Sequence, residues 1–316
     1  MTAIQLDELS KEYPVGFWRP RPYRALDSLS LSVEPGEVFG CLGPNGAGKT
    51  TTLKLLLHLV RPTSGRAEIL GQPVGDATVR RRIGYLPENP AFYDHLSGEE
   101  LLEYFAGLFG YSRADARRRA SARLDEVGLG AERRLPLRKY SKGMVQRVGI
   151  AQALINDPEV VFLDEPMSGL DPIGRRDVRA LILRLRDRGC TVFFSSHVLA
   201  DAEALCSRVA ILAKGRLVAS GRVSDLLAFR VHGWELVVSR ITRAAIDARI
   251  PGVRVVEIGH DRFAVEVPLD TPPERILQDL VACGASLVSL NPMRETLEDF
   301  FVESVAAAPP RGQEAG

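Results

Sequence analysis

The segment from Gly43 to Thr51 reads GPNGAGKTT, and it constrains this chain more than any other feature. It fits the pattern G-x-x-x-x-G-K-[ST], in which glycines let successive backbone N–H groups turn toward one phosphate. Lys49 adds a positive charge for the β- and γ-phosphates, and the Thr50 hydroxyl can bind Mg²⁺. We therefore predict that residues 43–51 hold the phosphates of a nucleotide.

The residues on either side favour a strand before this segment and a helix after it. Residues 38–42 form a short apolar run, typical of a buried strand. Apolar residues then recur at the spacing of one helix face, and a proline at 62 would end that helix: Leu53, Leu56, Leu57 and Val60. The positive N-terminal end of the helix would face the phosphates. This context favours a nucleotide site over a chance glycine-rich turn.

Strand and helix patterns alternate through the first 228 residues. Strand-like runs cover residues 29–33, 38–42, 67–70, 82–86, 160–163 and 191–195, with a hairpin at 209–212 and 217–219. Helical patterns cover 98–109, 114–127, 142–155 and 174–188. This alternation predicts an α/β fold with a largely parallel sheet. Residues 87–137 should form a helical lobe beside it, and residues 16–24 (GFWRPRPYR) an added loop.

The pattern changes near residue 229. Residues 229–305 read strand (234–239), helix (242–250), strand (253–258), strand (263–267), helix (273–283) and strand (286–290), followed by a last helix at 294–305. The order β-α-β-β-α-β predicts a small ferredoxin-like domain. We expect it either to hold two copies of the chain together or to act as a regulatory sensor. The tail, 306–316, should be disordered.

Composition narrows the class of protein. The 316 residues carry a net charge of +1, which argues against a nucleic-acid partner. The N-terminus lacks the features of a signal peptide, and no apolar stretch reaches the ~18 residues that span a bilayer. We therefore expect a soluble, cytosolic chain. Four cysteines without metal-like spacing should be buried free thiols: Cys41, Cys190, Cys206 and Cys283.

A second motif, VVFLDEP, places two acids at the end of the strand at 160–163. Ligands of open α/β sheets bind at the carboxyl ends of the strands. Asp164 can hold Mg²⁺, and Glu165 is placed as a general base for the attacking water. Paired with residues 43–51, these acids favour nucleotide hydrolysis over an ordinary acidic strand end.

Three shorter features complete the set. Ser141 is a good N-cap for the helix that follows it, and Gly143 would let a phosphate approach the exposed N–H groups. The sequence SGLD, ending in Asp171, follows the acidic strand. His197 ends the next strand, where an imidazole donor could reach a γ-phosphate.

Residues 4–224 together resemble the nucleotide-binding subunit of an ABC transporter, because every motif appears in the order of that family. VVFLDEP resembles Walker B with its catalytic Glu165, YSKGM stands at the signature, SGLD resembles the D-loop, and His197 the switch histidine. An aromatic residue usually stacks on adenine in this family; Tyr13 matches best and Tyr23 is the rival. GPNGAGKTT resembles Walker A and implies ATP contacts from Gly43, Pro44, Asn45, Gly46, Ala47, Gly48, Lys49, Thr50 and Thr51.

The resemblance implies a P-loop NTPase that works as a pair. Each ATP, with Mg²⁺ on Thr50 and Asp164, would lie between Lys49 of one copy and Ser141, Gly143 and Asp171 of the other. The pair would be a homodimer or include a close homologue. It would attach to integral-membrane transporter subunits at the cytoplasmic face of the cell membrane, and those subunits would choose the cargo.

Two departures from the family pattern matter. Glu88 replaces the glutamine that normally contacts Mg²⁺, and we expect its carboxylate to take that place as a ligand. Lys142 and Met144 replace glycine and glutamine in the signature. With the C-terminal domain, these features look like ATPases of the ABC-2 exporter group. A non-transport ABC ATPase is the main alternative. It usually has two cassettes or a long coiled-coil insertion, and this sequence shows neither. A GTPase or small-molecule kinase fits less well, because there is no NKxD segment.

Overall fold

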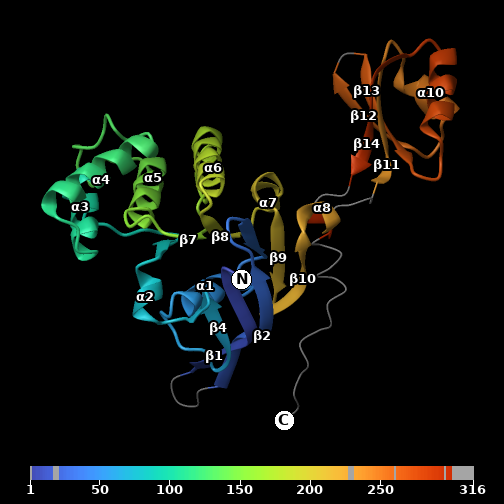
Figure 1. Cartoon of the computed structure of the whole chain (residues 1–316). Coiled ribbons are helices and arrows are strands. Elements are labelled where there is room, and N and C mark those ends of the chain that lie inside the picture. The colour runs from blue at the N-terminus through green and yellow to red at the C-terminus, as the bar shows by residue number, and fades with distance from the viewer. Residues whose placement is uncertain (1, 17–20, 227–230, 260, 295–296, 301–316) are drawn as a thin grey trace. The chain divides into compact units, whose positions relative to one another are not determined.

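The computed structural model describes residues 2–16, 21–226, 231–259, 261–294 and 297–300. Its backbone contacts divide the chain into two compact units, one up to Val223 and one that begins at Ser224. Figure 1 colours both by residue number. The predicted tail at 306–316 and most of the predicted last helix lie outside the described residues.

The first unit is built on a six-stranded sheet with the order β10-β9-β3-β8-β7-β6. Neighbouring strands are parallel except for the hairpin between β9 and β10, so the predicted parallel sheet is confirmed. Its strands are β3 (Val38–Leu42), β6 (Ile83–Leu86), β7 (Val160–Asp164), β8 (Thr191–Ser196), β9 (Arg208–Ala213) and β10 (Arg216–Arg222). Phe39 and Phe162 pack on Phe193 with ring centroids 5.6 and 5.9 Å away. Each buried phenylalanine contributes about 1.5–3 kcal/mol to folding.

A second, antiparallel sheet has the order β2-β1-β4-β5. Its strands are β1 (Ile4–Val15), β2 (Arg21–Val33), β4 (Ser64–Ile69) and β5 (Gln72–Pro73). The sequence did not reveal β1, because a bulge with a positive φ at Glu8 breaks the alternation of buried residues. The added loop predicted at residues 16–24 is wrong at residues 21–24, since these residues begin β2 and pair with β1.

Helices follow most of the predicted patterns, with ends shifted by a few residues. The helix after the glycine-rich loop ends earlier than predicted, at Leu56, and His58 has a positive φ. A helix at 199–205 was not predicted; it is short and has no side-chain cap. The helices of this unit are α1 (Lys49–Leu56), α2 (Ala77–Arg80), α3 (Gly98–Leu108), α4 (Arg113–Glu126), α5 (Lys142–Ala153), α6 (Pro172–Asp187), α7 (Leu199–Leu205) and the 3₁₀ turn η1 (Leu137–Lys139).

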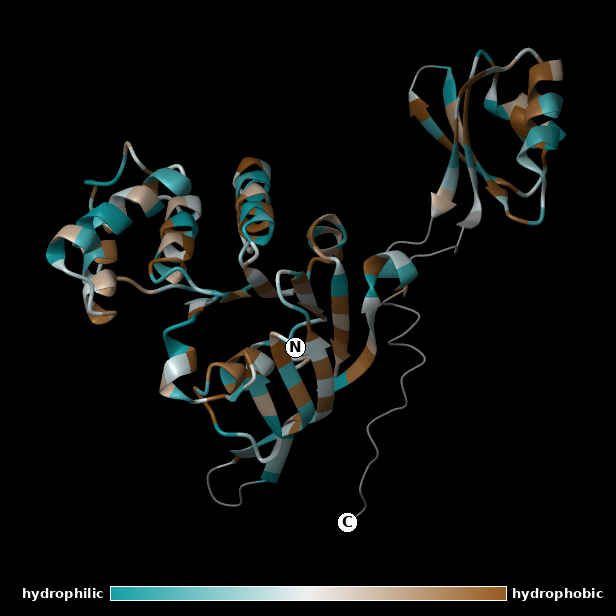
Figure 2. Cartoon of the chain, in the orientation of Figure 1, coloured by the Kyte–Doolittle hydropathy of each residue, from teal (hydrophilic) through white to brown (hydrophobic). Residues whose placement is uncertain are grey.

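Helices α3, α4 and α5 pack together as the helical lobe, which therefore extends beyond the predicted limit of residue 137 (Figure 1). Ser97 and Glu100 begin α3 with a reciprocal capping box, in which each side chain accepts a backbone N–H. Figure 2 shows much of α3 and α4 in teal, the colour of hydrophilic residues. In α4 many of these residues are arginines.

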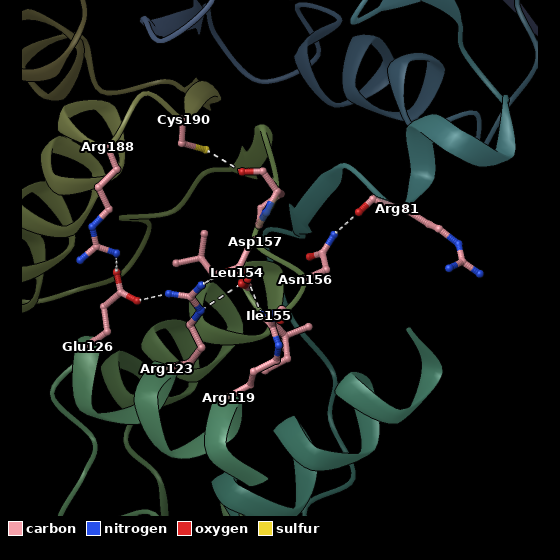
Figure 3. A network of polar contacts seen from close by, with 11 residues as sticks. Arg81, Arg119, Arg123, Glu126, Leu154, Ile155, Asn156, Asp157, Arg188 and Cys190 are labelled. Atoms are coloured by element: carbon pink, nitrogen blue, oxygen red, sulfur yellow. Dashed lines mark hydrogen bonds and ion pairs between the residues drawn. The ribbon is translucent and has the colours of Figure 1, made fainter. Parts of the chain in front are cut away.

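A network of ion pairs ties this lobe to the sheet (Figure 3). Arg119 and Arg123 of α4 both pair with Asp157, in the turn before β7. Glu126, at the end of α4, lies 2.5 Å from both Arg123 and Arg188. The Glu126 side chain is only 9% exposed, so its charge is well shielded from solvent. Its loss would remove the group that links Arg123 to Arg188.

The second unit has the predicted ferredoxin-like topology. Strands β11 (Val231–Ser239), β12 (Arg254–Gly259), β13 (Arg262–Pro268) and β14 (Ser286–Arg294) form an antiparallel sheet with the order β12-β13-β11-β14. Helices α9 (Arg243–Arg249) and α10 (Pro273–Ala282) pack on it around a separate apolar core. The last helix cannot begin at residue 294 as predicted, because β14 runs to that position; residues 297–300 are helical. A short helix, α8 (Val223–Leu226), lies at the boundary between the units.

The predictions about membrane-spanning segments and about the cysteines can also be compared with the described residues. Within them, no helix combines the length and apolar character needed to cross a membrane. All four cysteines are free, as predicted, but Cys283 is exposed and only Cys41 is classed as fully buried. Burial raises the pKa of the Cys41 thiol to about 12.

Candidate functional site

The glycine-rich loop connects β3 to α1, as predicted. Gly43 has a φ of 151°, and a Cβ atom there would collide with the Leu212 carbonyl. Gly48, with a φ of 110°, is the N-cap of α1, and a Cβ atom on it would lie 3.0 Å from the Ala25 carbonyl. Only glycine fits at these two positions. The loop therefore curves over the N-terminus of α1, where free N–H groups can face an anion.

Lys49, the first residue of α1, turns its side chain back into this loop. Its ammonium nitrogen donates to the Gly43 carbonyl at 2.7 Å and lies 3.3 Å from a Glu165 carboxylate oxygen. The side chain is only 6% exposed. A buried ammonium of this kind needs an anionic partner, and in this structure Glu165 supplies it.

Glu165 lies between Lys49 and His197. Its backbone adopts a left-handed conformation with a φ of 49°, and its N–H donates to the Ser195 hydroxyl at 3.0 Å. Its second carboxylate oxygen is 2.8 Å from Nδ1 of His197. An ionised carboxylate can only accept, so Nδ1 of His197 carries the proton of this hydrogen bond. The structure thus brings the two predicted catalytic residues into direct contact.

Asp164 ends β7 beside the Thr50 hydroxyl. Ser195 and Thr50 both donate to the same carboxylate oxygen, at 2.5 and 3.4 Å. Burial raises the pKa of Asp164; the two hydroxyl donors oppose this, and the charges of Glu165 and Glu88 add to it. A carboxylate and a hydroxyl are hard oxygen donors of the kind that Mg²⁺ prefers, so the residues present fit the predicted ion.

Ser195 is a site residue that the motifs of the sequence did not predict. This fully buried residue bridges the two acids, accepting from the Glu165 N–H and donating to Asp164. The available signal was a pair of serines ending an otherwise apolar strand that precedes His197. Polar residues at a buried strand end usually have a specific partner.

A cavity of about 230 Å³ opens beside the loop, and Glu88 and Glu165 line it together with Lys49. Tyr13 and Tyr23 are opposite each other on β1 and β2 and both line the cavity. The choice between the two tyrosines therefore stays open, although the Lys11 ammonium already lies 5.1 Å from the centroid of the Tyr13 ring. Asn45, Gly46, Ala47, Gly48, Thr50 and Thr51 also line this space.

Five predicted nucleotide contacts do not line this cavity. Gly43 and Pro44 lie at the start of the loop itself, and the other three lie outside the loop. Ser141 caps α5 by accepting the Met144 N–H at 3.3 Å, and Gly143 follows it in the first turn. Asp171 caps α6 by accepting the Gly174 N–H at 2.9 Å. The described residues of one copy therefore form two separate groups, one around Lys49 and one around Ser141.

Comparisons with known proteins show the family of this chain. A family profile described as "ABC transporter" matches residues 26–168. An uncharacterised ABC transporter ATP-binding protein of Synechocystis sp. is 46% identical over 306 residues, which cover 96% of this chain and 84% of that protein. The chain belongs to the ATP-binding proteins of ABC transporters.

This ABC ATP-binding protein is also similar to a drug-resistance protein and to a solved ABC structure. The daunorubicin/doxorubicin resistance ATP-binding protein of Streptomyces peucetius is 35% identical over 289 residues, covering 88% of this chain and 87% of that one. The ATP-binding cassette MJ0796, solved as a dimer in a post-hydrolysis state with ADP and Pi, is 27% identical with a TM-score of 0.64. It covers 69% of this chain and 98% of its own. This ABC ATP-binding protein is accordingly an ATPase.

Proposed function

We propose that this ABC ATP-binding protein works as a head-to-tail dimer and energises export by a separate membrane-spanning partner. The observation that carries the proposal is the convergence of Lys49, Asp164, Glu165 and His197 at the carboxyl ends of β3, β7 and β8. The names of relatives support transport, because the related Streptomyces protein is a drug-resistance ATP-binding protein. The protein would then act at the cytoplasmic face of the membrane.

Binding of ATP would release the general base. Lys49 is paired with Glu165 in this structure, and arriving phosphates would give its ammonium a stronger anionic partner. Glu165, still oriented by His197, would then be free to take a proton from the attacking water. Mg²⁺, when bound, would be held by Thr50 and Asp164 and would supply positive charge to the β- and γ-phosphates.

A second copy would complete the site. Ser141 and Gly143 lie at the positive N-terminal end of α5, away from the cavity of their own chain. In a head-to-tail pair they would face the γ-phosphate bound by the other copy, as the family resemblance implies. Two ATP molecules would therefore lie between the copies.

The first test separates binding from hydrolysis. Lys49→Ala should lose ATP binding, because it removes the charge that meets the phosphates. Glu165→Gln should bind ATP, accumulate as a dimer on size-exclusion chromatography and hydrolyse at least ~10²-fold more slowly. Glu159→Gln is a matched control, since Glu159 lies before the same strand and pairs with Arg82 instead. Near-normal turnover in Glu165→Gln would show that another group activates the water.

A further inference from the structure

Helices α6 and α7 each continue from one of the two proposed catalytic residues. The turn after Glu165 leads through the SGLD segment into α6, and α7 begins directly after the turn that holds His197. The two helices contact each other. Nδ1 of His197 also lies 2.8 Å from the Glu165 carboxylate, so the segments before the helices meet as well. The relative position of α6 and α7 therefore influences how the imidazole meets Glu165.

One ion pair joins these two helices. Arg179 of α6 donates from both Nε and Nη2 to one carboxylate oxygen of Asp201 in α7, and the Nε distance is 3.2 Å. The Asp201 side chain is only 2% exposed, whereas that of Arg179 is 36% exposed. A carboxylate so far from solvent depends on its charged partner, so the pair holds α7 against α6.

The carboxylate of Asp201 is not used to cap its own helix. Asp201 is in the first turn of α7, at the position from which an acid can reach back to the N–H of the N-cap residue. That residue is Val198, and its N–H instead donates to the Ser196 hydroxyl at 3.0 Å. The acid is therefore directed to α6, and the turn around His197 is closed by a separate local hydrogen bond.

We propose that Arg179 and Asp201 are positioning residues for His197. They fix the start of α7 relative to α6, and hence the imidazole relative to Glu165, whose backbone leads into α6. This inference rests on the proposed function, in which His197 orients the general base. Without the pair, α7 would still pack through the buried Ala202 and Leu205, but the turn that holds His197 would lose its charged connection to α6.

The first experiment measures kcat and KM for ATP hydrolysis by the full-length chain. Asp201→Ala removes the carboxylate and leaves an arginine that can reach solvent. We expect kcat to fall at least about tenfold and KM to stay within about threefold, because a displaced imidazole affects the chemical step more than binding. Arg179→Met should behave in the same way. Arg179→Lys should keep kcat within about threefold of wild type, because it restores a charged donor.

Arg186→Met is the matched control for the arginine variants. Arg186 lies on the same helix but pairs with its neighbour Asp187, so its loss should leave kcat unchanged. Calorimetry should show cooperative unfolding of every variant. If Asp201→Ala does not unfold cooperatively, Asp201→Asn takes its place, since it keeps the shape of the side chain. An unchanged kcat in both the Asp201 variant and Arg179→Met would overturn the proposal.

A second experiment separates positioning from a purely structural role. In the His197→Ala background, Asp201→Ala should lower the single-turnover rate by less than about twofold, because the residue through which the pair acts is already gone. A further loss of about tenfold in that background would show that the pair acts independently of His197, and the proposal would be overturned.

The third readout follows His197 directly and does not need turnover. In a chain with ¹⁵N-labelled imidazoles, the His197 signals are those that disappear in His197→Ala. In mildly alkaline buffer, where imidazole is neutral, wild type should show the proton on Nδ1. Asp201→Ala should show a mixture of the Nδ1–H and Nε2–H tautomers, because the hydrogen bond to Glu165 is no longer held in place. Signals identical to those of wild type would contradict the proposal.

The same variants show which proposal has failed. Turnover near the wild-type rate in His197→Ala would contradict the catalytic role of His197 in the proposed function, and this inference with it. Slow turnover in His197→Ala, followed by a full further loss on Asp201→Ala, would remove only the positioning role of Arg179 and Asp201.

Discussion

At the scale of single residues, Glu165 depends on its neighbours for both its backbone and its charge. A left-handed glutamate is uncommon and costs on the order of 1 kcal/mol or more. The Ser195 hydroxyl accepts its N–H, and Lys49 and His197 hold its carboxylate. These contacts fix the acid at the end of β7, and they would do so before any nucleotide arrives.

Glu88 is the second acid whose role a substitution can test. It is exposed at the rim of the cavity, and its charge is one of the influences that raise the pKa of Asp164. We propose that it contacts Mg²⁺ as the usual glutamine does. Glu88→Gln keeps that oxygen, so turnover at saturating Mg²⁺–ATP should stay within about tenfold, or ~1.4 kcal/mol, of wild type. A loss as large as that of Glu165→Gln would mean that the two acids share the activation of water or were assigned the wrong way round.

At the scale of elements, the helical lobe borders an apolar groove of about 300 Å³. Phe92, Phe105 and Phe109 line it on the lobe side and Tyr85 on the sheet side, while Tyr93 beside it is 62% exposed. The ion pairs around Asp157 and Glu126 hold the lobe to the strand that carries Asp164 (Figure 3). A segment that docks in the groove would therefore contact the helical lobe, which these ion pairs connect to the strand that carries Asp164.

We propose that this groove receives a segment of the membrane partner. Asp94, just beyond the aromatic residues, is 77% exposed. With Cys283 replaced by serine, Asp94→Cys should cross-link to the membrane subunit in assembled complexes and not to the second copy. Asp187→Cys, at an exposed site at the end of α6, is the control and should give no such product. Cross-linking of Asp94→Cys only within the dimer would rule out this docking face.

At the scale of the whole molecule, the two units have separate apolar cores. We propose that the ferredoxin-like unit holds two copies together. Removal of residues 229–316 should leave a first unit that unfolds cooperatively in calorimetry. Its rate of hydrolysis per subunit should fall on dilution below that of the full chain, because the dimer dissociates more readily. An unchanged dependence on dilution would favour a sensor role, and loss of cooperative unfolding would show that the units depend on each other.

The sequence by itself determined the α/β fold and the ferredoxin-like topology, and it predicted the loop, the two acids and the histidine that the structure brings together. Local rules suffice for these features: glycines at positions of positive φ, apolar runs for buried parallel strands, and acids at the ends of those strands.

Other features depend on contacts between residues far apart in the sequence, and only the tertiary structure decided them. Bulges at Glu8 and Ser28 break the period of two in β1 and β2. Only the register between the strands therefore shows β1 and the part of β2 before the predicted run at 29–33. The packing of α5 into the helical lobe depends on contacts with α3 and α4 that no short pattern records. Ser195 became a site residue only because β8 pairs in parallel with β7, which places its hydroxyl beside Asp164 and Glu165.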